Sequence, residues 1–148
     1  MLSPFLSACG LAFLTVATHA TGIGVLLQHL IHSQHLPTSL SLTMRLLLRI
    51  VWWLILLHLA EISIWALFYL WRGCIPDAET AFYFSGVTYT TIGYGDVVLA
   101  KPWRLLGPIE GLLGVLMCGL STGYFFVVGS HIYQSGLGRI TATSPSEG

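Results

Sequence analysis

Three long apolar stretches dominate the pattern of hydrophobic and polar positions along the chain. They cover residues 5–31, 45–71 and 103–133, with few polar residues inside them. A hydrocarbon core about 30 Å thick is crossed by about 20 helical residues, so each stretch is long enough to span a bilayer as a helix. The pattern predicts an all-α membrane protein, and we name the three predicted spans the first, outer and inner helices.

Prolines and aromatic residues predict where these helices end. Pro37 and its small polar neighbours break the apolar pattern, so residues 33–44 are expected to form a short loop. Trp52 and Trp53 lie near one end of the outer helix, and Tyr69 and Trp71 lie near the other, as in two interfacial aromatic belts. Tryptophan is enriched at both membrane interfaces, which supports the interpretation that the outer helix spans the bilayer.

The segment between the outer and inner helices is too short and too polar for a fourth span. Residues 78–90 nevertheless have helical character, and Pro76 or Asp77 supplies a start signal. Residues 91–96 must then be irregular backbone, which is tolerated at membrane depth only where protein buries it or a watery pathway passes it. The pattern therefore predicts a re-entrant pore helix, followed by a segment that lines a pathway.

Composition agrees with a membrane protein and removes several classes of function. Hydrophobic residues make up 55% of the chain and charged residues 8%, against about 25% charged in soluble domains. The net charge is zero and no basic stripe is present, so nucleic-acid binding is not expected. No phosphate loop or nucleophile elbow suggests an enzyme. The three cysteines form no C-x-x-C pair, and neither a zinc site nor an internal disulfide framework is suggested.

Six residues after the predicted pore helix carry the most specific chemistry of the chain. They form a T-x-G-Y-G-D motif: Thr91, Ile92, Gly93, Tyr94, Gly95 and Asp96. In potassium-selective pores, backbone carbonyls of four T-x-G-Y-G strands replace the hydration shell of the ion. The motif predicts a selectivity filter with K+ bound at its carbonyl oxygens and no other cofactor.

Each residue type in the motif has a physical reason to be there. Gly93 and Gly95 permit the positive φ angles that direct successive carbonyls toward the pore axis. Thr91 adds a hydroxyl at the inner ion site. Ile92 and Tyr94 are expected to point away from the axis and to brace the opening against pore helices.

Residues 78–128 resemble the pore domain of the potassium channel superfamily, particularly small bacterial two-helix channels. The run from residue 81 to residue 96 is similar to their pore helix and filter, with Ile92 where valine is usual. Val87 stands where the best-known bacterial channels have a glutamate behind the filter, so inactivation linked to that carboxylate is not expected. The first helix is an addition to the two-helix plan.

The resemblance also suggests roles at the outer mouth of the pore. Asp96 would attract cations there or form a hydrogen bond to the pore helix. Tyr83 stands where a tryptophan is common, and its hydroxyl could still donate a hydrogen bond to Asp96.

The resemblance implies a homotetramer around a central pore in a bilayer, with the aspartate end of the filter facing outside. The first helix (1–32) would then begin outside the cell, in a multi-pass protein of the plasma membrane. The loop (33–44) and a short disordered tail (134–148) would be cytosolic. The pore domain is expected to cover residues 45–133, with the inner helix at 103–133.

The inner helix offers candidates for a hinge and a gate. Gly114 and Gly123 lie where inner helices of inward rectifiers have glycines, so bending is one interpretation. Close helix packing through small residues is the other. Helical spacing places Cys118 and Phe125 on the face of Gly114, where Phe125 is either a hydrophobic constriction or a lipid-facing residue.

Glu110 is an ionisable residue inside a predicted span, at the depth of the filter. Such residues are functional candidates by default. We expect Glu110 to brace the filter from behind, through Thr88 or Tyr89, and its protonation could tune conduction. The alternative is a structural hydrogen bond without titration.

A second group of polar residues lies near mid-membrane. His58 and Glu61 share a face of the outer helix, and His19 falls at the same depth in the first helix. We expect His19 to pack against His58 or Glu61 and to fasten the first helix by interhelical hydrogen bonds. Proton sensing is the alternative.

These observations together predict a subunit of a potassium-selective channel. Gating would be intrinsic to the filter or the inner helices, without a cytosolic ligand domain. Two other interpretations stay open: a non-selective cation or regulatory pore subunit, and a non-conducting structural membrane protein.

Overall fold

Helices are the regular secondary structure of the described part of the chain, and short irregular segments join them. The computed structural model describes residues 2–32 and 40–142. The elements within them are α1 (Leu2–His32), α2 (Leu40–Trp71), α3 (Ala78–Tyr89), the 3-10 helix η1 (Lys101–Trp103) and α4 (Leu106–Ala142). Helices suit a bilayer because each satisfies its own backbone polar groups.

Three of the helices are long and apolar enough to cross a membrane. The candidate spans are Pro4–Leu30, Ser41–Trp71 and Lys101–Gln134. The short helix α3 lies between the second and third spans, as expected for a pore helix. The prediction of an all-α, multi-pass membrane protein is confirmed.

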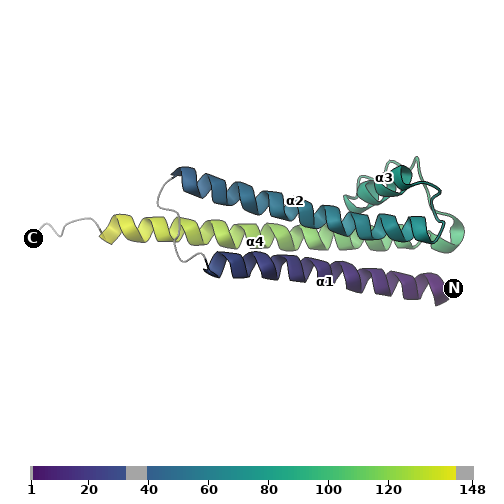
Figure 1. Ribbon diagram of the computed structural model, residues 1–148, viewed down its shortest axis with the longest axis horizontal. Helices are drawn as coiled ribbons and strands as arrows, with labels where there is room; N and C mark the ends of the chain where they lie inside the picture. Colours follow the sequence, from purple (N-terminus) through teal and green to yellow (C-terminus); the bar gives the residue numbers. More distant parts are fainter. Residues whose placement is uncertain (1, 33–39, 143–148) are drawn as a thin grey trace, which may run out of the picture.

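The long helices lie side by side, and α2 runs antiparallel to α1 and α4 (Figure 1). Helix α1 packs on both α2 and α4, while α3 packs against α2 and α4 at one end of the bundle (Figure 1). Helix α1 begins at the end that carries α3, and α4 ends at the opposite end (Figure 1). The extra helix is therefore an integral part of the bundle.

Two predicted boundaries are wrong because polar residues were interpreted as loop or disorder. Helix α2 begins at Leu40, so residues 40–44 of the predicted loop are helical. Serine and threonine are common at helix starts, and a polar first turn is therefore compatible with a helix. Helix α4 continues to Ala142, although a disordered tail was expected from residue 134. Extending an existing helix avoids the cost of nucleating a new one.

The remaining parts of that loop and tail, residues 33–39 and 143–148, lie outside the described residues. Helix α3 ends at Tyr89, one residue before the expected end. Of the two candidate start signals, Asp77 is the N-cap, since its side chain accepts a hydrogen bond from the backbone N–H of Thr80 at 2.8 Å. That bond holds the pKa of the Asp77 carboxyl below its ordinary value.

The two larger of three groups of buried side chains among the described residues lie at opposite ends of the bundle. The group at the α3 end includes Trp65, Tyr69 and Phe84, and it joins α1, α2, α3 and α4. The group at the other end contains Leu26, Ile50, Leu54 and Val128. The pore helix is therefore packed into the larger of these two groups, which fixes the start of the segment that follows it.

Helix α4 approaches the end of α3 closely at Gly114. A Cβ atom at this position would lie 1.9 Å from the carbonyl oxygen of Tyr89, far inside any real contact. A Cβ at Gly111 would lie 3.3 Å from the carbonyl oxygen of Thr88. Because both neighbours are backbone atoms, side-chain rotation cannot relieve the clash. Gly114 therefore serves close packing against α3, and α4 continues through it as unbroken helix.

We predict that Gly114→Ala lowers the free energy of unfolding by about 2 kcal/mol or more, because overpacking typically costs about 1–3 kcal/mol. The measurement is unfolding of the purified protein in mixed detergent micelles. Gly119→Ala is the matched control, since no atom lies within 4 Å of a Cβ added there. Equal losses in the two variants would contradict the proposed close contact.

Candidate functional site

The segment after α3 has the backbone that the motif predicts. Gly93 and Gly95 adopt φ angles of +57° and +78°. Thr91 has φ of +61° and is the one non-glycine residue in this region of conformational space among the described residues. Positive φ therefore recurs at every second residue. That alternation turns successive carbonyls to one side of the strand, as a row of ion ligands requires.

The start of this segment is tied to the pore helix by backbone hydrogen bonds. The N–H of Thr91 donates to the carbonyl of Thr88 at 2.9 Å, and the N–H of Gly93 donates to the carbonyl of Val87 at 3.2 Å. Val87 thus lies behind the segment as expected, and it acts through its carbonyl group. These bonds hold the left-handed residues in place.

The side chains of Ile92 and Tyr94 do not pack within their own chain. They are 56% and 69% exposed, although we expected them to wedge against pore helices. Helix α3 of the same chain therefore leaves more than half of each side chain uncovered.

Tyr83 and Asp96 form the expected hydrogen bond at the far end of the segment. The hydroxyl of Tyr83 donates to Oδ2 of Asp96 at 2.6 Å. This bond holds the pKa of the Asp96 carboxyl below its ordinary value and raises the pKa of the Tyr83 hydroxyl. It links the first half of α3 to the end of the segment, so that the two ends of the strand are fixed to the same helix.

Glu110 lies behind α3 and is completely buried. Its carboxylate accepts hydrogen bonds from Tyr69 Oη at 2.6 Å and from Ser85 Oγ at 2.5 Å. The expectation that it acts through Thr88 or Tyr89 was wrong. Depth along the inner helix indicated the pore helix correctly, but Ser85, one turn before Thr88 on the same face of α3, lies opposite Glu110.

Sequence reasoning missed the role of Tyr69 because a tyrosine near a helix end was interpreted as part of an interfacial aromatic belt. The missed signal was its position four residues after Trp65, on the face that also carries Ile62. Tyr69 is fully buried. Glu110 thus joins α4 to both α2 and α3.

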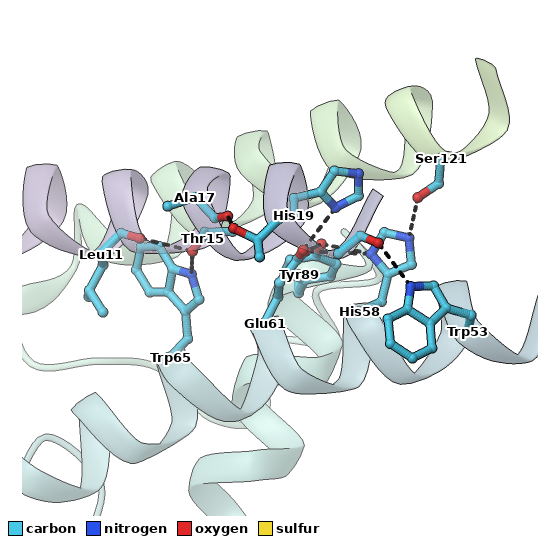
Figure 2. Close-up of polar contacts among 12 residues, drawn as sticks. Leu11, Thr15, Ala17, His19, Trp53, His58, Glu61, Trp65, Tyr89 and Ser121 are labelled. Carbon is cyan, nitrogen blue, oxygen red and sulfur yellow. Dashed lines mark hydrogen bonds and ion pairs between the residues drawn. The ribbon is translucent and has the colours of Figure 1, made fainter. Parts of the chain in front are cut away.

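A second buried carboxylate, Glu61, lies within the second candidate span, Ser41–Trp71 (Figure 2). His19 Nδ1 of α1 lies 2.8 Å from Glu61 Oε1, which confirms the expected contact between the first and outer helices. The hydroxyl of Tyr89 donates to Glu61 Oε2. Tyr89 is the last residue of α3 and precedes Thr91 by two positions, so this carboxylate is coupled to the start of the motif.

His58 continues the same network. Its Nδ1 lies 2.9 Å from the hydroxyl oxygen of Tyr89, and its Nε2 lies 3.1 Å from Ser121 Oγ of α4. One set of proton positions satisfies every contact: Ser121 donates to His58, His58 to Tyr89, and Tyr89 to Glu61. The network therefore joins all four helices. Tyr89 and Ser121 were not predicted, because neither stands out in an apolar sequence.

Two further hydrogen bonds dock α1 along α2 (Figure 2). Trp65 Nε1 donates to Thr15 Oγ1 at 2.9 Å, and Trp53 Nε1 donates to the carbonyl of Gly22 at 3.0 Å. Together with the contact of His19 they fall at successive turns of α1. Trp53, which was interpreted as an interfacial residue, also fastens α1.

The candidate gate residues on α4 differ in how far they are exposed. Cys118 and Gly123 are exposed in the single chain, consistent with a free face of the helix. Phe125 is partly buried and packs against the group formed by Leu26, Ile50, Leu54 and Val128. That contact favours packing within the subunit, and the role of Phe125 as a constriction stays a prediction.

A family model described as "Ion channel" matches residues 54–130, slightly more than half of the chain. The matched part begins within α2, includes α3 and the T-x-G-Y-G-D motif, and ends within α4. The chain belongs to this family, is an ion channel protein and is not an enzyme. No curated protein and no solved structure shows a significant match.

We predict that Tyr83→Phe raises the pKa of Asp96 toward its ordinary value, because the variant lacks the hydroxyl that donates to the carboxylate. The chain has two aspartates, Asp77 and Asp96, so carboxyl-13C labelling of aspartate gives two titrating NMR signals. Stability linked to this bond is present above the ordinary pKa of aspartate and is lost as pH falls through the lowered pKa. The Asp77 signal is the internal control and should titrate unchanged. An unshifted Asp96 signal would show that the bond does not form in solution.

We predict that Glu110→Leu destabilises the protein by about 1–3 kcal/mol, since the buried hydroxyl of Tyr69 loses its acceptor, while Ser85 keeps the carbonyl of Ile62 at 2.8 Å. Glu110→Gln retains one acceptor oxygen and should lose less. Unfolding in mixed micelles measures both. The prediction fails if leucine is tolerated as well as glutamine.

Proposed function

We propose that the chain is one subunit of a homotetrameric, potassium-selective channel. The observation that carries the proposal is the alternation of positive φ at Thr91, Gly93 and Gly95 within a T-x-G-Y-G motif. An ion of this kind must lose its water, and rows of backbone carbonyls replace the hydration shell in potassium-selective filters. The carbonyls of residues 91–95 would bind the K+ ions.

Four copies are needed because one strand supplies a quarter of such a filter, and cyclic symmetry closes the ring. The exposure of the strand supports this part of the proposal. Ile92 and Tyr94 are more than half exposed in the single chain. Irregular backbone and its side chains at membrane depth need protein around them, which neighbouring subunits would provide.

The proposed orientation places Asp96 at the outer mouth, following the resemblance to potassium channels. Helix α1 would then begin outside, and α4 would end in the cytosol. The positive-inside rule does not decide between orientations, since basic residues occur on both sides: Arg45, Arg49 and Arg139 on one, and Arg72, Lys101 and Arg104 on the other.

Regulation is proposed to act on the filter from behind. Glu110 contacts α3 at Ser85, and Glu61 contacts α3 at its last residue, Tyr89. Both carboxylates therefore restrain the helix that anchors Thr91 and Gly93. A change at either one would reach the ion pathway through α3, while α4 supplies Gly114 and Gly123 as candidate hinge positions.

The test is ion flux from proteoliposomes that contain the purified chain, with Na+ as the competing ion and Ba2+ as the blocker. We expect K+ flux that Ba2+ blocks and Na+ does not replace. Gly93→Ala should abolish it, because alanine at φ of +57° is strained. Gly119→Ala, in open space away from the motif, is the control that should conduct.

Each other outcome contradicts a stated part of the proposal. Equal Na+ and K+ flux would indicate a non-selective cation pore. A monomer or dimer in native mass spectrometry, without flux, would favour a non-conducting structural role.

A further inference from the structure

The polar network around Glu61 contains three side chains that commonly bind metals. The ligand atoms of His19, His58 and Glu61 all lie within 4.8 Å of one another. We propose that these three residues form a binding site for a divalent transition-metal cation of the zinc class. The proposal goes beyond potassium conduction, and it does not require the chain to conduct.

The distances are close to those around a tetrahedral ion. Ligands about 2.0–2.1 Å from zinc at tetrahedral angles lie roughly 3.3 Å apart. His19 Nδ1 is 2.8 Å from Glu61 Oε1, and His58 Nδ1 is 3.5 Å from Glu61 Oε2. The two separations run to different oxygens of the Glu61 carboxylate, and all the ligand atoms lie within 4.8 Å of one another. Rotation of the side chains would therefore have to draw the two imidazoles and the carboxylate around the ion.

The donor set selects the class of metal. Two imidazole nitrogens and one carboxylate oxygen suit zinc and its transition-metal neighbours, whereas K+, Ca2+ and Mg2+ prefer oxygen ligands. The hydroxyl oxygen of Tyr89, 2.9 Å from His58 Nδ1, lies beside the set where a fourth ligand would be needed. Three protein ligands with one further position are a common zinc arrangement.

Charge provides a separate argument. Glu61 is completely buried at membrane depth, where an unpaired carboxylate is costly. Within the described part of the chain it pairs with the imidazoles of His19 and His58, which carry no charge in their neutral form. A divalent cation supplies the missing positive charge and leaves both imidazoles neutral, as metal ligands must be.

The surroundings of His58 suit a metal ligand, because its second ring nitrogen, Nε2, has a hydrogen-bond partner. Its Nε2 lies 3.1 Å from Ser121 Oγ, and a hydroxyl can either donate or accept. The proton can therefore move from Nδ1 to Nε2 when Nδ1 binds the ion, without loss of that hydrogen bond. His19 Nε2 has no hydrogen-bond partner within the described residues, so the proton that it would carry when Nδ1 binds the ion would lack an acceptor from these residues. The side chain of His58 is 19% exposed, which leaves an approach for the ion.

Occupancy would have two consequences. The hydrogen bond between His19 of α1 and Glu61 of α2 would be replaced by coordination of both residues to the same ion. This would fasten α1 to α2 more strongly. It would also place positive charge beside Tyr89, two residues before Thr91. Metal binding would therefore change the electrostatic surroundings of the first residues of the proposed filter.

The experiment is zinc titration of the full chain, purified in detergent without a histidine tag and treated with a chelator beforehand. Zinc per chain is measured by elemental mass spectrometry, and affinity by calorimetry. We expect one zinc per chain. His19→Gln and Glu61→Gln should each lose that zinc, and Ser121→Ala should weaken binding by about tenfold, as loss of a partner to a ligand typically does.

His32→Gln is the matched control, since His32 is exposed at the end of α1 and lies outside the cluster. It should bind zinc as the unchanged chain does. Less than one zinc per chain, or full binding in both His19→Gln and Glu61→Gln, would overturn the proposal. Zinc that is lost in His32→Gln would point to the helix end and would overturn it equally.

A second measurement on the unchanged chain covers variants that do not fold. Cobalt should give the visible absorption of a tetrahedral ion, and X-ray absorption of the zinc form should show imidazole ligands. An octahedral cobalt spectrum without imidazole ligation would reject the site. These readouts require no ion flux, so failure of the metal site and failure of potassium conduction are separately recognised.

Discussion

A carboxylate buried inside a membrane must find partners, and Glu61 meets this constraint by gathering side chains from the helices around it. It contacts His19 of α1, His58 of its own helix and Tyr89 of α3, and His58 extends the network to Ser121 of α4. Apolar contacts alone favour no particular rotation of one helix against another in lipid. A polar network does, because only one arrangement satisfies its donors and acceptors.

The segment that carries the T-x-G-Y-G-D motif depends on this arrangement indirectly. Its left-handed residues are held by bonds to the end of α3, and α3 is itself held from two sides, by Glu61 at Tyr89 and by Glu110 at Ser85. The missing side chain of Gly114 lets α4 reach the backbone of Tyr89. The irregular strand is thus positioned by a short helix that α2 and α4 hold from two sides.

The motif, the spans and the pore helix could be predicted because each depends on residues that are close together in the sequence. Apolar runs of sufficient length are helices in a bilayer, and glycines at alternate positions of the motif mark positive φ. The partners of Glu110 could not be predicted from depth alone. A shift of α3 along its axis by about one turn exchanges Thr88 for Ser85, because the two residues share a face. Ser41 and Thr43, and the small and polar residues of 134–142, misled for another reason: polarity does not prevent a helix from starting or continuing.

The sequence by itself determined that the chain crosses a membrane three times, carries a re-entrant helix and presents a filter motif, because hydropathy and backbone conformation act over a few residues. It also placed His19, His58 and Glu61 at one depth. Only the tertiary structure decided that Tyr89 and Ser121 complete this group and that Tyr69 and Ser85 hold Glu110. Such contacts join residues 25 to 63 positions apart, and their geometry depends on how whole helices pack.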